Sequence, residues 1–434
     1  MSLTWMRRQT RVIALGTLMT LTASSCAPTG ADEGDNAPQS GENPEEPVDS
    51  TVDAVTDLTH TSVKRQSIGN CWIYATTGWI ESMRAKYTRT TANPAGEQLN
   101  ISESWVTYWH WYSQLTAGAT GNEIETGGFW GEAGNLIIDR GYVSEGDFIP
   151  EEANSEQSAR QSSALNAINA SMLNGALATA AARRDGRIVR AELNRAFGLR
   201  TEILAEMDSL FGADGVRTLA NTRATRRFVK RPTELYVGSA RTSTGSSRRL
   251  TLSDVFGRSN TSWNPDLRSG TYAWRSASYP SDMAGRTRFW QRVMRAMNDG
   301  HPVIVSWLVD FNALDSMGNF SLTQLRSAGT PGRQGGHLTV AEDYTVNNVP
   351  GFGSLGIGML SAEQRAAALM GTINFLRIKN SWGTDRPDRA SHNGYYDLYA
   401  DYMNGPIDWK TSEAPMSPTR RQTPLDEAIL PPGY

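Results

Sequence analysis

The hydrophobic positions of the chain follow a helical period in its first part and a strand-like pattern in its last part. Apolar residues at helical spacing predict one helix over residues 72–87 and another directly after Ser102, which suits a helix N-cap. A glycine turn at Gly127 and Gly128 leads into a third helical stretch. Beyond residue 272, one more helical stretch precedes the strand-like runs HPVIVSWLV, HLTVAEDYTV, INFLRIKNSW and GYYDLY. Helices first and strands last predict an α+β protein of two lobes with a cleft between them.

Residues 155–235 interrupt this order with a stretch that is rich in Ala, Leu and Arg and predicts a helical insertion. From residue 181 to residue 231 it carries twelve Lys or Arg against six Asp or Glu. This basic excess is either the solvated face of the helices or a site for phosphate or another polyanion.

The N-terminus has the three parts of a signal peptide, which we place at residues 1–25. Three arginines precede an apolar run over residues 12–21, which is shorter than the ~20 residues that span a bilayer. The small residues before Cys26 resemble a bacterial lipoprotein processing site, in which Cys26 becomes the lipidated first residue. Ordinary signal cleavage before Cys26 fits the same residues. We therefore expect an exported protein of the cell envelope, either an outer-membrane lipoprotein anchored through Cys26 or a secreted or periplasmic protein.

The segments that flank the predicted body of the chain have their own composition. Residues 26–58 are predicted as an acidic tether, because residues 27–57 contain nine Asp or Glu, no Lys or Arg, and too few apolar residues for a core. Residues 406–434 are rich in Pro and are predicted as a C-terminal tail. This tail either lies over the surface or occupies the cleft.

Composition narrows the class of protein. A hydrophobic content of 39% and thirteen Trp among 434 residues predict a real core, and a net charge of −3 does not favour nucleic acid as a partner. Two cysteines cannot build a disulfide framework. One of them, Cys71, is followed by Trp72 at the start of a predicted helix. Such a cysteine is either a small buried apolar residue or a nucleophile at a helix N-terminus, where the helix dipole favours the thiolate.

A cysteine nucleophile needs a base and a group that orients the base. The five histidines are His60, His110, His301, His337 and His392. We select His337, because it opens a predicted strand after the flexible segment TPGRQGG and can project at the strand edge. The segment IKNSWG offers Asn380, whose amide can accept the imidazole N–H, and Trp382, which can shield that hydrogen bond from water.

Five segments carry this pattern, namely QSIGNCWIYA, ETGGFWGEA, GHPVIV, GGHLTVAEDY and RIKNSWG. With them the chain resembles the papain-like cysteine peptidases, and the lack of a disulfide framework brings it closer to the bleomycin hydrolase branch. The resemblance implies a papain-like two-lobed fold over residues 59–405, with the helical insertion inside it. The helical lobe would carry Cys71 as nucleophile. A β-barrel-like lobe would carry His337 as base and later acid, and Asn380 as the orienting amide.

The resemblance also implies residues that bind the substrate and its oxyanion. Gln66 would be the side-chain donor of the oxyanion hole, and the backbone at Gly127 and Gly128 would pair with an extended substrate. Trp382 is assigned to the same substrate-binding group. Gln66 stands five residues before the cysteine, one fewer than is usual in the family, so either the loop is shorter or Arg65 takes the place of Gln66.

These features together predict an enzyme that hydrolyses peptide bonds in peptides or proteins through a thioester acyl-enzyme. No cofactor, metal or nucleic acid is expected. Two alternatives stay open at this point. The same three residues could transfer an acyl group to an amine in place of water, or the scaffold could be a binding module without catalysis.

Overall fold

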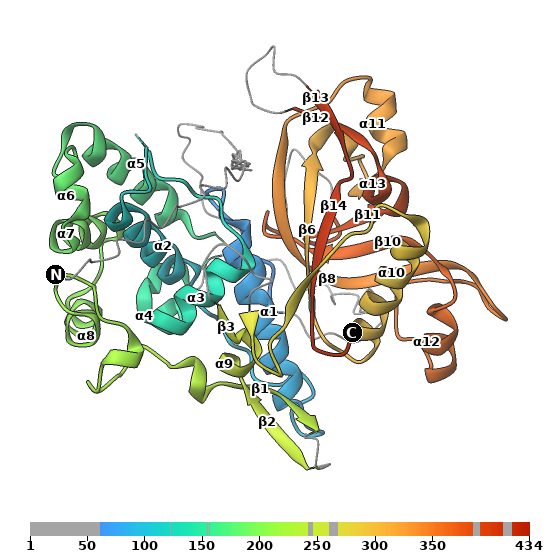
Figure 1. Ribbon diagram of the computed structural model, residues 1–434, viewed down its shortest axis with the longest axis horizontal. Coiled ribbons are helices and arrows are strands. Elements are labelled where there is room, and N and C mark those ends of the chain that lie inside the picture. Colours follow the sequence, from blue (N-terminus) through green and yellow to red (C-terminus); the bar gives the residue numbers. More distant parts are fainter. Residues whose placement is uncertain are drawn as a thin grey trace, which may run out of the picture.

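The computed structural model describes residues 61–121, 123–153, 155, 157–241, 246–259, 268–384, 391–410 and 419–434. The predicted signal peptide, Cys26, the tether and His60 lie outside the described residues. Figure 1 shows two lobes, one mainly of helices and one built around a large sheet. The prediction of a two-lobed α+β protein is confirmed. No helix among the described residues has the length and the apolar character needed to cross a membrane.

The helical lobe begins with α1, which starts at the nucleophile candidate, and contains most of the helices of the chain. Its helices are α1 (Cys71–Thr88), α2 (Glu103–Ala117), α3 (Trp130–Arg140), α4 (Glu145–Phe148), η1 (Pro150–Glu152), α5 (Ala159–Asn174), α6 (Ala180–Arg184), α7 (Gly186–Phe197), α8 (Thr201–Phe211), η2 (Leu219–Asn221), η3 (Pro232–Glu234) and α9 (Leu252–Phe256). Two small ribbons, β1 (Tyr236–Arg241) with β2 (Ser247–Thr251) and β3 (Arg258–Ser259) with β4 (Arg268–Ser269), complete it.

One hydrophobic core joins all parts of this lobe. Trp79 of α1, Trp105 of α2 and Trp130 of α3 are almost fully buried, and they share their core with Val189 of α7 and Phe211 of α8. The segment predicted as a helical insertion is helical, and it packs into this core, not beside it. The predicted N-cap of α2 is also confirmed, because the Ser102 side chain accepts from the backbone N–H of Trp105.

The second lobe is an eight-stranded sheet with helices on its faces and ends. Its elements are β5 (Arg275–Ser278), α10 (Met283–Asn298), β6 (Val303–Asp310), η5 (Phe311–Ala313), β7 (Asn319–Phe320), α11 (Leu322–Ala328), β8 (Gln334–Val349), β9 (Gly353–Leu355), α12 (Ala362–Ala368), β10 (Thr372–Lys379), β11 (Tyr395–Tyr399), α13 (Ala400–Asn404), β12 (Ile407–Lys410), β13 (Thr419–Gln422) and β14 (Leu425–Leu430). The sheet order is β5-β14-β6-β8-β10-β11-β7, with β9 paired to β8, while β12 and β13 form a separate ribbon.

The sheet does not close into a barrel. Among the described strands, β5 and β7 end the sheet on opposite sides and do not pair with each other. The expectation of a β-barrel-like lobe is therefore corrected to an open, curved arrangement around β8, which pairs with both β6 and β10.

The C-terminal residues are part of this sheet, so the prediction of a Pro-rich tail over residues 406–434 is wrong for its described part. β14 lies between β5 and β6 and pairs with both in antiparallel register. Its residues Ala428, Ile429 and Leu430 are buried. The apolar run of β14 is short and is flanked by prolines, and its partner strands lie more than 100 residues earlier in the chain. The sequence pattern therefore did not indicate a strand here.

Candidate active site

Cys71 is the first residue of α1 and lies at the boundary between the two lobes. Its side chain is 6% exposed, and it is a free cysteine. The backbone N–H of Leu338, the residue after His337, donates to its sulfur. This contact across the boundary brings the start of α1 against the start of β8.

His337 and Asn380 form the hydrogen bond that the sequence analysis predicts. The Nε2 atom of His337 lies 2.7 Å from Oδ1 of Asn380, and Oδ1 also accepts from the backbone N–H of Ser381 at 2.7 Å. Since an amide oxygen only accepts, Nε2 carries the imidazole proton and Nδ1 keeps its lone pair. Within the described residues Nδ1 makes no hydrogen bond. The imidazole is therefore held in the tautomer that can take a proton at Nδ1.

The register of the sheet explains why these two residues meet. His337 lies near the start of β8, opposite Trp307 of β6, and Asn380 directly follows the last residue of β10. Because β8 and β10 run antiparallel, the end of β10 lies beside the start of β8. The 42 residues between His337 and Asn380 therefore form a hairpin-like excursion away from the site.

Trp382 covers the imidazole ring. Its ring is stacked on that of His337, with centroids 5.0 Å apart and an interplanar angle of 20°. Phe311 packs on it at 5.2 Å, and Trp382 is only 2% exposed. This position suits the predicted shielding of the His337–Asn380 hydrogen bond. A contact of Trp382 with substrate stays a prediction.

Burial favours the uncharged form of both Cys71 and His337. It raises the pKa of the Cys71 thiol to about 11, although the backbone N–H groups of Leu338, Trp72 and Cys71 itself lower it. Burial lowers the pKa of His337 to about 4, although the hydrogen bond to Asn380 raises it. Burial therefore opposes the effect of the helix N-terminus on Cys71 and favours the neutral thiol and the neutral imidazole.

Gln66 is buried at the joint between the lobes. Its Oε1 accepts from the Ser381 hydroxyl at 2.6 Å, and its backbone N–H donates to the Ser381 carbonyl at 2.8 Å. Its Nε2 donates one N–H to the Ile68 carbonyl at 2.8 Å, which leaves the second N–H to donate. Arg65 forms backbone bridges to Trp382 and Gln157 on the two sides. The chain thus places Gln66, next to the triad residue Asn380, in a fixed orientation.

The glycine pair lies against the tryptophan that follows the nucleophile. The indole N–H of Trp72 donates to the Thr126 carbonyl at 2.9 Å. A Cβ atom at Gly128 would lie only 2.5 Å from Cε2 of Trp72. Gly127 and Gly128 are partly exposed. The segment therefore packs on the residue after Cys71 and is partly exposed, and the pairing of its backbone with a substrate stays a prediction.

Gly128→Ala is expected to move the backbone of this segment away from Trp72 and the neighbouring Cys71, because the rigid indole ring of Trp72 cannot yield to a Cβ at that distance. We expect a loss of about 1–3 kcal/mol in the free energy of unfolding and a clear fall in kcat/KM for a peptide substrate. Gly121→Ala is the matched control, since a Cβ there meets nothing within 4 Å. Equal activity of the two variants would contradict the predicted role of the backbone at Gly127 and Gly128 in binding the substrate.

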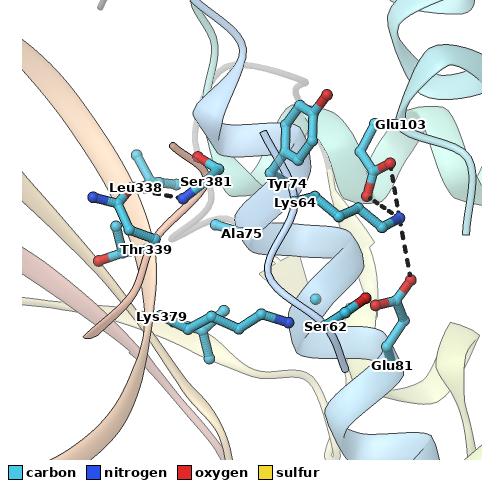
Figure 2. Close-up of a pocket in the computed structure, with 13 residues that line it drawn as sticks. Ser62, Lys64, Tyr74, Ala75, Glu81, Glu103, Leu338, Thr339, Lys379 and Ser381 are labelled. Carbon is cyan, nitrogen blue, oxygen red and sulfur yellow. Dashed lines mark hydrogen bonds and ion pairs between the residues drawn. The ribbon is translucent and has the colours of Figure 1, made fainter. Parts of the chain in front are cut away.

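A charged cavity that is partly open to solvent lies between the lobes, and no pattern in the sequence predicts it. Lys64 lies 2.9 Å from Glu103 and 3.9 Å from Glu81 (Figure 2). Lys379 enters from β10 and donates to the Thr61 carbonyl at 2.6 Å, while the Thr61 hydroxyl donates to Glu81 at 2.6 Å. The volume of about 20 Å³ leaves room for about one water molecule. These bonds join both lobes through the segment that precedes α1.

This cavity borders the triad, because Leu338, Asn380 and Ser381 line it as well. Burial lowers the pKa of Lys379 to about 8, although Glu81 raises it. The signal in the sequence was a lone lysine at the end of the apolar run NFLRIKN, directly before Asn380. Lys379 ends β10 directly before Asn380, so its hydrogen bond to Thr61 fixes the position of β10 relative to the helical lobe.

The other described histidines serve elsewhere. His110 lies with its ring 4.9 Å from that of Trp72 and its Nδ1 2.9 Å from Glu132. His301 contacts aromatic rings at the far end of α10, and His392 faces the β11 strand. Among the described residues, no group of His, Cys, Asp and Glu side chains could hold a metal ion.

Comparisons with known proteins give distant likenesses only. No family model matches the chain, and no curated protein matches it. One similar solved structure is PepW from Lactobacillus rhamnosis HN001, with 13% identity and a TM-score of 0.41 over 88% of this chain and 82% of that chain. Another is Xylellain, a cysteine protease from Xylella fastidiosa, with 11% identity and a TM-score of 0.34 over 85% of this chain and 82% of that chain. Because both TM-scores are low, neither likeness establishes the activity of this chain.

Proposed function

We propose that the protein is a papain-like cysteine peptidase with Cys71 as nucleophile, His337 as general base and acid, and Asn380 as the orienting amide. One observation carries the proposal. The Nδ1 lone pair of His337 is left open by the hydrogen bond between Nε2 and Asn380, and the residue after His337 donates to the Cys71 sulfur. These contacts support the proposal, because a cysteine nucleophile needs a base in the correct tautomer and a group that orients this base. The three candidates come from segments that are distant in the sequence.

The reaction begins from the neutral thiol. As the sulfur attacks a peptide carbonyl, the thiol proton passes to Nδ1 of His337, and the carbonyl oxygen gains the negative charge. The resulting imidazolium gives that proton to the departing amine, which leaves a thioester on Cys71. A water molecule then loses a proton to His337 and attacks the thioester, which frees the acid and restores the thiol. Asn380 keeps the imidazole in one tautomer throughout.

The oxyanion would be held by the backbone N–H of Cys71 and by the second N–H of Gln66. Since an oxyanion donor acts on charge that develops in the transition state, its loss lowers kcat and leaves KM nearly unchanged. We expect Gln66→Ala to lower kcat by about 10²–10³ and Arg65→Ala to have little effect. The measurement is steady-state hydrolysis of a fluorogenic peptide.

Ser381→Ala controls for the structural part of this effect. It removes the hydroxyl that donates to Gln66 but keeps the amide donor of Gln66, so its loss of kcat should be smaller. If Arg65→Ala proves more damaging to kcat than Gln66→Ala, the proposed alignment of the loop before Cys71 is wrong.

Two measurements test the reaction class. An epoxide or vinyl-sulfone reagent should label Cys71, and peptide mapping identifies the modified residue. Digestion of a peptide library, with and without an added amine, separates hydrolysis from acyl transfer by the mass of the products. Labelling without any cleavage or transfer would leave a reactive thiol in a binding module and would overturn the proposed function.

The proposed location follows from the three-part pattern at residues 1–25 and the position of Cys26. The protein would be exported and anchored in the cell envelope through lipid on Cys26. Radiolabelled palmitate should then enter the wild-type protein in a bacterial host, and the Cys26→Ser variant should leave the membrane fraction. Equal partition of both proteins would contradict lipidation.

A further inference from the structure

A line of buried hydrogen bonds connects the residue before Cys71 to a carboxyl group in another element. The Nδ2 of Asn70 donates to Oε1 of Gln161 at 2.8 Å, and Nε2 of Gln161 donates to the hydroxyl of Ser104 at 3.0 Å. The Ser104 hydroxyl donates to Oε2 of Glu152 at 2.7 Å. We call these four residues the Asn70–Glu152 network. It passes from α1 through α5 and α2 to η1.

Every donor of this network points toward Glu152. The four residues are 4% exposed or less, so their bonds are sheltered from solvent. A carboxylate only accepts, and each amide or hydroxyl along the line passes its donor on in the same direction. Such aligned bonds polarise one another in a low dielectric, and a negative charge at the end strengthens the alignment.

Asn70 stands at the N-cap position of α1, but its side chain does not cap this helix. Asparagine at a helix N-cap usually bonds a backbone N–H of the first turn, yet the Asn70 side chain makes no such bond. The side-chain Nδ2 of Asn70 instead donates to Gln161 and to Thr107 at 3.0 Å. Its backbone carbonyl accepts from the N–H of Ile73. The first turn of α1 is therefore fixed sideways against α2 and α5, which lie on the same side of it (Figure 1).

We propose that the Asn70–Glu152 network positions the nucleophile, with Gln161 and Glu152 as positioning residues for Cys71. This inference rests on the proposed peptidase function and extends it to the helical segment 155–235, which supplies Gln161. The network fixes Asn70, and the Asn70 carbonyl fixes the first turn of the helix that carries the thiol. A displacement of that turn would change the distance between the sulfur and Nδ1 of His337.

The charge on Glu152 gives the network a dependence on pH. Burial, with a smaller contribution from the nearby charge of Glu103, raises the pKa of Glu152 to about 7, although the hydrogen bond from Ser104 and the backbone and charge of Arg160 lower it. Tyr74 also faces this group. The carboxylate is therefore present at alkaline pH and is lost as the pH falls through about 7. Below that range the aligned bonds lose their anionic end.

Gln161→Met tests the network, because it keeps the volume of the side chain and removes both hydrogen bonds. We expect kcat to fall about tenfold or more with little change in KM. Hydrogen exchange should become faster for the backbone N–H groups in the first turn of α1 and stay unchanged in α10 of the other lobe. The exposed Asn166→Ala on the same helix is the control and should match wild type.

Glu152→Gln tests the anionic end. Wild-type kcat should fall between about pH 8 and about pH 6, whereas the variant should show a low kcat that changes little over that range. Glu145→Gln is the matched control. Burial and the charge of Glu103 raise the pKa of Glu145 to about 8, and the Glu145 charge also interacts with that of Glu152. Glu145 lies outside the network and pairs with Lys64, so this variant should keep the wild-type fall, displaced to slightly lower pH because one negative charge near Glu152 is lost.

The two readouts separate this inference from the proposed function. If wild type cleaves no peptide, the proposed function fails, and hydrogen exchange still decides whether the network holds α1. If Gln161→Met leaves both kcat and exchange at the start of α1 unchanged, or if Glu145→Gln and Glu152→Gln behave alike, the positioning role is overturned. Should Gln161→Met not fold, Ser104→Ala interrupts the same line and is measured in its place.

Discussion

Cys71→Ser is expected to abolish peptide hydrolysis, with kcat/KM lower by more than about 10³. A serine hydroxyl is a much weaker acid than a thiol, and the neutral imidazole of His337, whose pKa is lowered to about 4, is too weak a base to activate it. The fold should persist, because the Leu338 N–H can donate to the new oxygen as it does to the sulfur. The measurements are steady-state hydrolysis and the thermal midpoint of unfolding.

The same substitution at the other cysteine is the control. Cys26→Ser should leave hydrolysis by the full chain unchanged, because Cys26 belongs to the N-terminal segment and not to the candidate site. Turnover by Cys71→Ser that equals wild type, with the fold intact, would end the assignment of Cys71 as nucleophile.

His337→Ala is expected to lower kcat/KM by about 10²–10⁴, because the general base and acid is lost. The same variant should also change how stability depends on pH. The unfolded chain takes up a proton at His337 near pH 6.5, whereas the folded site resists protonation until about pH 4. Wild type therefore loses stability as the pH falls from about 6.5 to about 4, by up to about 3 kcal/mol from this group, and His337→Ala should lack that loss.

His301→Ala is the matched control for both effects. Burial also lowers the pKa of His301 to about 4, but its ring packs on Trp274 and Tyr434, which are not part of the candidate site. This variant should keep hydrolysis and should lose a comparable part of the acid destabilisation. If His301→Ala abolishes hydrolysis and His337→Ala does not, the base has been misassigned.

The three triad candidates could be predicted because each has a local signal. Cys71 precedes a tryptophan at the start of a helical period, His337 opens a strand after a flexible glycine segment, and Asn380 ends a strand in NSWG. The structure places the three at one boundary between the lobes. Their separation in the sequence did not matter, because each candidate could be recognised from its residue type and its place at the start or end of a predicted helix or strand.

The C-terminal strand and the charged cavity could not be predicted in the same way. β14 gains its place from β5 and β6, and its short apolar run gives no sign of them. In the sequence, Lys64 and Lys379 look like ordinary surface lysines, because only the packing of the two lobes against each other covers them. β14 and its partner strands lie more than 100 positions apart, as do Lys379 and Thr61, and Lys64 lies 39 positions from Glu103. A local sequence pattern holds no information over such separations.

The amino-acid sequence by itself determined that helices come first and most strands last, that a helix starts directly after Cys71, and which residues are the candidates for nucleophile, base and orienter. These follow from hydrophobic period, capping and side-chain chemistry, which act over a few residues. Only the tertiary structure decided that burial shifts the pKa of the thiol upward and that of the imidazole downward, and that the Asn70 side chain bonds Gln161 in place of its own helix. Protonation depends on burial and hydrogen-bond direction depends on distant partners, and both arise only when the lobes pack.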